Sequence, residues 1–182
     1  LTKFINGTSD CVAGCVCSSD DFIHQMTDVN SGAAMLLGPV LDSYRAASIL
    51  KNLHSLHIRM QRHSANALFL AEKLEKLGLK VFYPGLPSHR QHELIKQIGN
   101  PGFGYGGMLA IDIGDSEKAN RLMAKMQEEK VGYFAVSLGY FKTCSVVRAT
   151  APRQRSPSKN KKIWDLAVGS LGFRLDSIMI SN

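Results

Sequence analysis

The 182-residue chain is long enough for one domain with a sizeable hydrophobic core, and it has no apolar run of the roughly 20 residues that a membrane-spanning helix needs. The formal net charge of +7 is local: residues 142–162 hold seven basic side chains and no acidic one, which leaves 15 basic against 15 acidic residues elsewhere. A neutral body, and a basic segment without interleaved aromatic residues, argue against a membrane or a specific nucleic acid as partner.

Four cysteines, Cys11, Cys15, Cys17 and Cys144, could in principle bind a metal or form disulfides. Their spacing matches no common zinc pattern and no histidine lies nearby at ligand spacing, so we expect no metal site. Buried free thiols in a reducing compartment are the simpler interpretation, and they predict a cytoplasmic protein.

The first seventeen residues combine a lysine, a turn and an apolar run. Lys3 precedes a Gly-Thr-Ser-Asp turn at residues 7–10, and the run Val12–Cys17 predicts a short buried strand. A lysine in a partly desolvated site loses its charge readily, and the neutral amine forms Schiff bases with carbonyl compounds. Lys3 is therefore a candidate nucleophile, although most lysines are solvated surface charges.

Helical signals dominate residues 18–78. Ser18-Ser19-Asp20 can cap a helix over residues 21–28, and Asn30-Ser31-Gly32 then ends it. Pro39 suits the first position of a further helix, and the chain is helical in character from there to Leu77, with Gly78 as its stop. One face of the long helix carries residues at steps of three and four: Leu56, Met60, His63, Ala67, Leu70, Leu74 and Leu77. We expect the histidine on this face to be packed and hydrogen-bonded rather than catalytic.

The second half alternates strands and helices. The patterns predict strands at Leu79–Tyr83, Met108–Ile113 and Val131–Leu138, and helices at His92–Ile98 and after Asp115. Glycine-rich residues 100–107 precede a strand, whereas a phosphate-binding loop follows a strand and opens a helix. We therefore interpret them as a loop that leads into an edge strand. The order predicts a small α+β domain with its helices on one face of the sheet.

Three short motifs resemble those of one enzyme family. Thr2-Lys3-Phe4-Ile5, followed by Gly7 and Ser9-Asp10, resembles the cofactor-lysine motif of the Cys/Met-metabolism family of pyridoxal-phosphate enzymes. Residues 59–67, with Arg59-Met60, His63 and Asn66-Ala67, resemble the family's helix that leads from its large domain into its small one. Ser137-Leu138-Gly139 resembles the family's Ser-Leu-Gly motif. Segments 83–87, 91–94 and 104–107 are most similar to its plant methionine γ-lyase branch.

The resemblance implies an α/β fold: a C-terminal fragment of a pyridoxal-phosphate-dependent transferase subunit of the aspartate aminotransferase-like fold type I. Residues 1–55 would be the remnant of the large cofactor-binding domain and residues 56–146 the small C-terminal α+β domain. Residues 147–182 would be a divergent basic tail, since the similarity fades after about residue 141. Residues 147–162 are rich in Pro, Ser and Gln, a composition typical of disorder. Residues 163–167 are compatible with codons that, read one base later, give the Gly-Ile-Ser of the family, so a frame-shifted tail is a second hypothesis.

The resemblance also implies roles for three residues. Lys3 would carry pyridoxal phosphate as an internal aldimine and would act as catalytic base and acid. Thr2 would help to hold the cofactor phosphate, and Ser137 would lie beside the α-carboxylate of the substrate.

The implied activity is that of a carbon–sulfur lyase of sulfur amino-acid metabolism. The plant-like segments favour methionine γ-lyase chemistry, which converts methionine to methanethiol, 2-oxobutanoate and ammonia. Cystathionine γ-synthase or lyase activity is an open alternative. A further alternative is an inactive truncated fragment that acts at most as a non-catalytic subunit partner, because the family assembles as homotetramers with shared active sites.

Overall fold

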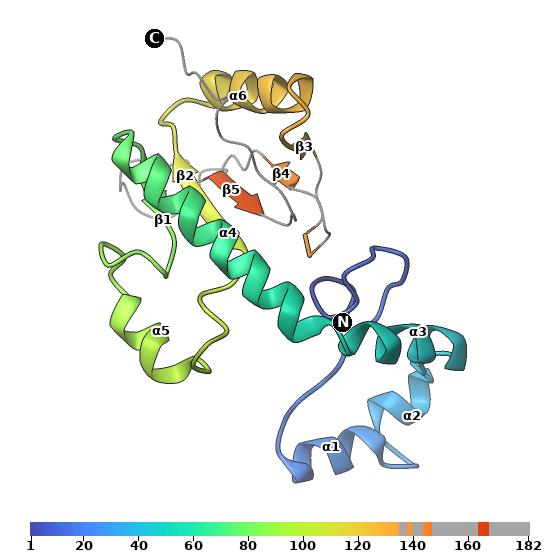
Figure 1. The fold of residues 1–182 in the computed structure, drawn as a ribbon. Helices are drawn as coiled ribbons and strands as arrows, with labels where there is room; N and C mark the ends of the chain where they lie inside the picture. The colour runs from blue at the N-terminus through green and yellow to red at the C-terminus, as the bar shows by residue number, and fades with distance from the viewer. Residues whose placement is uncertain (135–137, 140–143, 147–163, 168–182) are drawn as a thin grey trace, which may run out of the picture.

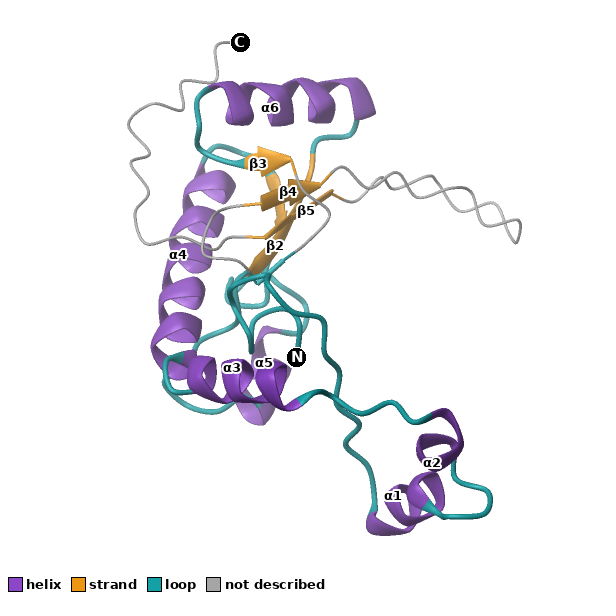
Figure 2. Ribbon diagram, turned by 90° about the vertical axis from the view of Figure 1, so that its right-hand side faces the viewer, coloured by secondary structure: helices purple, strands orange, loops and turns teal. Residues whose placement is uncertain are grey.

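The computed structural model describes residues 1–134, 138–139, 144–146 and 164–167 of the chain. They form three short N-terminal helices, one long helix, and a five-stranded sheet with two further helices (Figure 1). Helices α1 and α2 protrude from the rest of the molecule, and α4 runs from the N-terminal region to the sheet (Figure 2). The long helix therefore links the lysine segment to the sheet.

The N-terminal helices α1 (Asp20–Thr27) and α3 (Ser43–Leu53) begin at side-chain caps. The Ser19 hydroxyl accepts a hydrogen bond from the Phe22 amide, which confirms the predicted first helix. The helix predicted from Pro39 begins only at Ser43, because the Asp42 carboxylate accepts a hydrogen bond from the Arg45 amide and so caps α3 there. The short helix α2 (Ala33–Leu37) lies between them and ends at Gly38, whose φ of +63° is left-handed.

The strand predicted at Val12–Cys17 is wrong. These residues are in no regular element, and the side chains of Val12 and Val16 are 83% and 55% exposed. Cys15 and Cys17 are also exposed, so of the three cysteines near the N-terminus only Cys11 is buried as expected. A strand needs a neighbour to complete its backbone hydrogen bonds, and all the strands that the structure describes belong to one sheet built from later residues.

Helix α4 (Leu56–Lys76) provides the core-facing surface that its periodicity predicts. Ala67, Leu70 and Ala71 pack with residues of the sheet and of α6 (Ser116–Glu128) in one hydrophobic core. The members of this core are Ala67, Leu70, Ala71, Tyr83, Leu86, Leu109, Ile111 and Ala119. Gly78 ends the helix with a φ of +80°, as predicted, but Leu77 at the end of the apolar face is 64% exposed.

The sheet has the order β1-β2-β5-β4-β3, with β3 and β4 parallel and the other pairs antiparallel. Its strands are β1 (Lys80–Phe82), β2 (Met108–Asp112), β3 (Tyr133–Phe134), β4 (Cys144–Val146) and β5 (Trp164–Ala167). The prediction that β2 is an edge strand is wrong, because β5 pairs with its second side, Leu109 opposite Leu166. Strand β5 comes from the segment that the sequence assigns to the divergent tail. The expected mixture of helices and a small sheet is confirmed.

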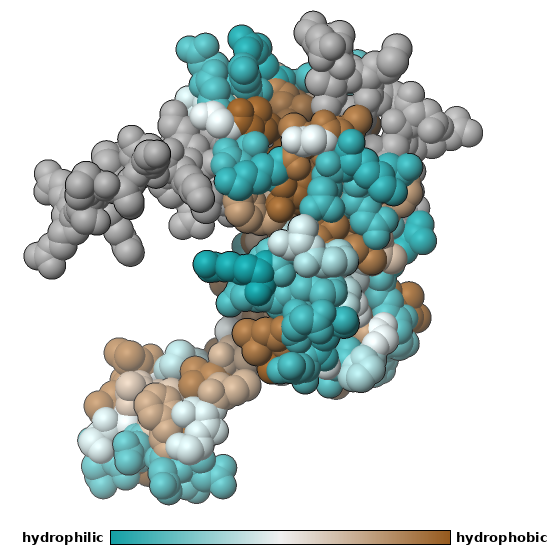
Figure 3. Space-filling view, turned by 90° about the vertical axis from the view of Figure 1, so that its left-hand side faces the viewer, coloured by the Kyte–Doolittle hydropathy of each residue, from teal (hydrophilic) through white to brown (hydrophobic). Residues whose placement is uncertain are grey.

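Large apolar side chains are exposed along the N-terminal segment, among them Val12, Val16, Phe22, Val29, Met35, Leu36, Leu37, Val40, Tyr44 and Leu50. Figure 3 shows brown and tan atoms gathered on the protruding part at the lower left. No helix among the described residues is long and apolar enough to cross a membrane.

Leu70 and Leu77 lie on the same predicted helix face but differ in burial, 6% against 64% exposed. We expect Leu70→Ala to lower the free energy of unfolding by about 2–5 kcal/mol, because it leaves a cavity in the core. Leu77→Ala is the matched control and should cost less than about 1 kcal/mol. Denaturant unfolding of both variants measures the difference, and equal costs would contradict the described packing.

Candidate functional site around Lys3

Lys3 lies in a tight turn at the start of the chain. The Asn6 amide donates to the Leu1 carbonyl at 3.0 Å, and the Gly7 amide donates to the Lys3 carbonyl at 2.8 Å. Gly7 closes the turn with a φ of +77°, a conformation that L side chains rarely adopt. The lysine side chain is exposed while its backbone is held in the turn.

Thr2 is paired with Ala13 across the loop. The Thr2 amide and hydroxyl both donate to the Ala13 carbonyl at 3.1 Å, and the Ala13 amide donates back to the Thr2 hydroxyl at 2.8 Å. These contacts bring residues 11–13 alongside the lysine turn and fix the threonine side chain next to Lys3.

Arg59, in the first turn of α4, reaches the lysine turn from the other side. Its guanidinium donates to the carbonyls of Phe4 at 2.5 Å and Ile5 at 3.0 Å. It also donates to the Asn52 carbonyl at 3.0 Å and to the Ser55 hydroxyl at 3.1 Å. Burial lowers the pKa of Arg59, but the ordinary pKa of a guanidinium is so high that it stays charged at neutral pH.

A buried asparagine completes the attachment of the turn. Asn6 is 1% exposed; its side chain donates to the Asp10 carboxylate at 2.8 Å and accepts from Asn52 at 2.9 Å. The Thr8 hydroxyl also donates to Asp10, at 2.6 Å. The hydrogen bonds from Asn6 and Thr8 lower the pKa of Asp10, so its carboxylate is ionised at neutral pH and keeps both contacts.

Gly139 of the Ser-Leu-Gly motif lies against the peptide that joins Lys3 to Phe4. A Cβ atom at Gly139 would lie 2.4 Å from the Lys3 carbonyl carbon and 2.4 Å from the Phe4 nitrogen, so the two backbones touch. Only glycine permits such an approach, and its φ of +81° is left-handed as well. Ser137 itself lies outside the described residues, two positions before this contact.

His63, in the same motif as Arg59, also contacts the lysine segment. The histidine is 6% exposed, and its ring meets the ring of Phe4 edge-on at 5.5 Å. It is packed, as expected. The three sequence motifs thus meet at the Lys3 turn. The helix motif contacts it through Arg59 and the Ser-Leu-Gly motif through Gly139.

The sequence interpretation gave no role to Arg59, Asn6 or Asn52, although they hold the turn in place. Arg59 precedes His63 by one helical turn, so it shares the face that was expected to point inwards. An arginine on the core-facing side of a helix needs buried hydrogen-bond acceptors. This position in the sequence is therefore a signal from which the role of Arg59 could be predicted. The two asparagines carry no comparable sequence signal.

A second polar cluster fixes the glycine-rich loop to α4. Ser64 donates to the Phe103 carbonyl at 2.8 Å and accepts from the Gly106 amide at 3.0 Å, and the buried Tyr83 hydroxyl donates to the Gly106 carbonyl at 2.8 Å. Burial raises the pKa of Tyr83, which therefore stays protonated as a donor. The loop leads into β2, as predicted, and it is used in packing against α4.

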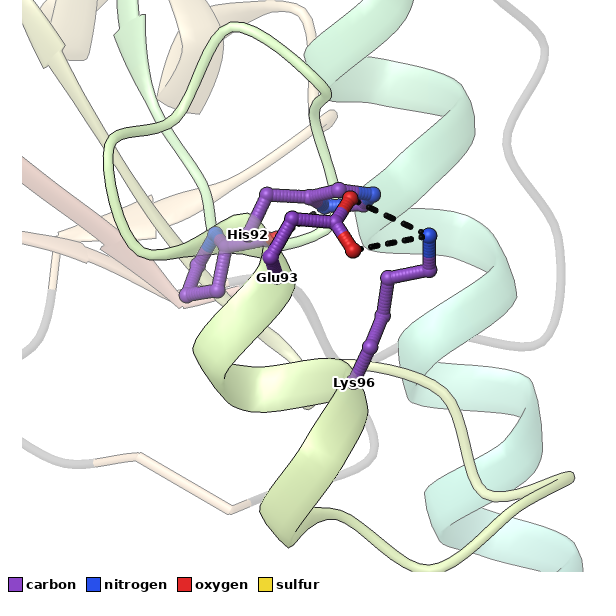
Figure 4. A network of polar contacts seen from close by, with 4 residues as sticks. His92, Glu93 and Lys96 are labelled. Atoms are coloured by element: carbon purple, nitrogen blue, oxygen red, sulfur yellow. Dashed lines mark hydrogen bonds and ion pairs between the residues drawn. The ribbon is translucent and has the colours of Figure 1, made fainter.

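Helix α5 (His92–Ile98) carries His92, Glu93 and Lys96, which Figure 4 shows from close by. The His92 Nδ1 atom lies 2.8 Å from the Pro84 carbonyl, and its ring lies 5.5 Å from that of Tyr105. Glu93 and Lys96 form an exposed ion pair at 3.2 Å on the same helix (Figure 4). Because this ion pair is exposed and lies within one helix, it contributes only a few tenths of a kcal/mol.

Comparison with known proteins identifies the family. The model of the family described as Cys/Met metabolism PLP-dependent enzyme matches residues 1–168, which is further than the motifs alone carried the resemblance. The chain belongs to this pyridoxal-phosphate enzyme family. Methionine gamma-lyase of Arabidopsis thaliana is 44% identical over 144 residues, which are 79% of this chain and 33% of that protein. The chloroplastic cystathionine gamma-synthase 1 of the same plant is 34% identical over 142 residues, 76% of this chain and 23% of that protein.

Solved structures of the family agree with the fold. The crystal structure of cystathionine gamma-synthase from Xanthomonas oryzae pv. oryzae in complex with aminoacrylate and cysteine matches with a TM-score of 0.74 at 27% identity. The match covers 94% of this chain and 44% of that one. The chain thus spans about a third or less of the curated relatives named above and under half of the solved structure.

The residues around Lys3 fit the cofactor that this family uses. Pyridoxal phosphate needs an amine for its aldehyde and hydrogen-bond donors for its phosphate, and Lys3 and Thr2 offer one of each. The Ala13 carbonyl accepts from both the Thr2 amide and the Thr2 hydroxyl. The hydroxyl can therefore turn towards a phosphate while the carbonyl keeps a partner. Among the described residues there is no group of three His, Cys, Asp or Glu side chains that could hold a metal ion.

Gly139→Ala tests the contact between the Ser-Leu-Gly motif and Lys3. Gly114 is a matched control, because its φ of +75° is also left-handed but a Cβ there meets nothing within 4 Å. We expect Gly114→Ala to cost about 1–2 kcal/mol of unfolding free energy from backbone strain alone. Gly139→Ala should cost more, because its Cβ must also displace the Lys3–Phe4 peptide. Denaturant unfolding compares the two, and equal losses would show that Gly139 does not touch the lysine turn.

Proposed function

We propose that this chain carries the cofactor lysine of a pyridoxal-phosphate-dependent carbon–sulfur lyase, and that Lys3 is that lysine. The observation that carries the proposal is the convergence of three residues on the segment from Lys3 to Ile5, in which Lys3 is exposed. Arg59 binds the Phe4 and Ile5 carbonyls, His63 packs on the Phe4 ring, and Gly139 lies against the Lys3–Phe4 peptide. A held backbone with an exposed lysine is suited to a nucleophile that must meet a carbonyl in one orientation.

Each site residue has a task in this proposal. Lys3 would hold the cofactor and would move protons as general base and general acid. Thr2 donates its hydroxyl hydrogen to the cofactor phosphate. Ser137, which lies outside the described residues, would bind the substrate carboxylate; in support of this role, Gly139 of the same motif packs on the Lys3 peptide. The cofactor, when bound, supplies an electron sink for the carbanion next to the nitrogen.

The proposed substrate is methionine, cleaved to methanethiol, 2-oxobutanoate and ammonia. This choice is supported by the 44% identity to a plant methionine gamma-lyase, against 34% to the plant cystathionine gamma-synthase and 35% to the cystathionine gamma-lyase of Dictyostelium discoideum. Cystathionine γ-synthase or γ-lyase chemistry is the second candidate. A homotetramer in the cytoplasm is the assembly and location that go with the proposal.

Lys3→Ala tests the proposal directly. The purified chain mixed with pyridoxal phosphate should give a long-wavelength absorption band, and borohydride reduction should leave the cofactor covalently attached to the peptide that contains Lys3. Lys3→Ala should lose both signals, because no amine remains at that position. Lys51→Ala, which removes an exposed lysine of α3, is the control and should keep both.

Attachment spread evenly over the lysines of the chain would contradict the proposal. Where Lys3 is attached selectively, addition of methionine or cystathionine, with detection of 2-oxobutanoate, separates the two candidate activities. Release from methionine supports the first and release from cystathionine alone the second. No release from either substrate would favour the non-catalytic subunit partner.

A further inference from the structure

The guanidinium of Arg59 occupies a position where three peptide carbonyls meet. It donates to Phe4 at 2.5 Å and Ile5 at 3.0 Å in the lysine turn, and to Asn52 at 3.0 Å at the end of α3. Its Nε atom donates to the Ser55 hydroxyl at 3.1 Å, just before α4 begins. One side chain thus ties the lysine turn to two helices.

With these bonds, three consecutive carbonyls of the lysine turn all accept hydrogen bonds. The Lys3 carbonyl accepts from the Gly7 amide at 2.8 Å, and the next two carbonyls, of Phe4 and Ile5, accept from Arg59. Three successive peptide groups that begin at the lysine are therefore held in one orientation. Because the Cα–Cβ bond of a residue follows from its backbone, the direction in which the Lys3 side chain leaves the turn is set as well.

The turn is shaped to admit the guanidinium. A Cβ atom at Gly7 would lie 2.4 Å from the nearer terminal nitrogen of Arg59 and 2.9 Å from its central carbon. Any other residue at position 7 would displace the arginine. The glycine thus serves two needs, the positive φ of the turn and the close approach of Arg59.

We infer that Arg59 is a positioning residue for Lys3: its planar fork holds the Phe4 and Ile5 carbonyls and so aims the lysine amine at the cofactor aldehyde. The inference rests on the proposed role of Lys3. A lysine at position 59 would keep the charge, but it is a point donor and does not present two parallel N–H groups to neighbouring carbonyls. A misplacement of the reacting atom by about 1 Å can cost up to about a hundredfold in rate.

The experiment compares Arg59→Lys and Arg59→Met with the unaltered chain. Arg62→Met is the matched control, because Arg62 is an exposed arginine of the same helix. Each protein is incubated with pyridoxal phosphate, reduced with borohydride at set times, and digested, so that the rate of attachment is obtained for each lysine. Hydrogen exchange of the Asn6 and Gly7 amides is measured on the same proteins without cofactor.

We expect both Arg59 variants to slow attachment at Lys3 by roughly tenfold or more, with attachment at Lys51 unchanged. The Asn6 and Gly7 amides should exchange faster by a similar factor, whereas the Leu70 amide in the middle of α4 should not change. Arg62→Met should match the unaltered chain. A variant that fails to fold would show fast exchange at Leu70, and the other Arg59 variant then decides.

The outcomes separate this inference from the function on which it rests. If Lys3 of the unaltered chain is attached no faster than the other lysines, the proposed function fails. If Lys3 is attached selectively and Arg59→Lys leaves both its rate and the Asn6 and Gly7 exchange unchanged, the function stands and the positioning role is overturned. Faster exchange without slower attachment would also overturn it, since Arg59 would then only stabilise the turn.

Discussion

A guanidinium drawn into a half-buried position must find acceptors for its N–H groups, and Arg59 finds them on the backbone around Lys3. This requirement explains the residues nearby. Gly7 leaves room for the guanidinium, and the buried Asn6 binds Asn52 and Asp10 so that the turn keeps its shape. An unmet buried guanidinium donor would cost more than an ordinary hydrogen bond gains, so Arg59 couples the stability of the turn to that of the helix.

The long helix α4 connects the lysine turn to the hydrophobic core of the sheet. Its first turn holds Arg59, and Ala67, Leu70 and Ala71 further along pack in the core with β1, β2 and α6. Gly139, which follows β3, returns from the sheet side to the Lys3–Phe4 peptide. The lysine turn is thus held by two contacts, one from Arg59 of α4 and one from Gly139 after β3. The substrate carboxylate proposed for the Ser-Leu-Gly segment would be held relative to the lysine turn by the same contacts.

Helix periodicity and helix ends, which depend on residues close in sequence, could be predicted from local patterns. The leucine spacing of α4, its stop at Gly78 and the bounds of α5 could be predicted, since periodicity and capping act within a few residues. Long-range strand pairing could not be predicted. Val12–Cys17 has the composition of a strand but pairs with no strand among the described residues, and β2 is central only because Trp164–Ala167 pairs with it. Motifs pointed to Lys3 and Thr2, whereas the contacts of Arg59 required coordinates.

The central claim is that the lysine turn and the Ser-Leu-Gly segment touch in one site. Nuclear magnetic resonance on protein labelled at glycine and phenylalanine tests it, because a hydrogen on the Gly139 Cα must point at the Phe4 nitrogen. We predict a strong Overhauser cross-peak between that α-proton and the Phe4 amide proton. If both residues show their sequential cross-peaks and this one is missing, the motifs do not meet and the site around Lys3 is not the one described.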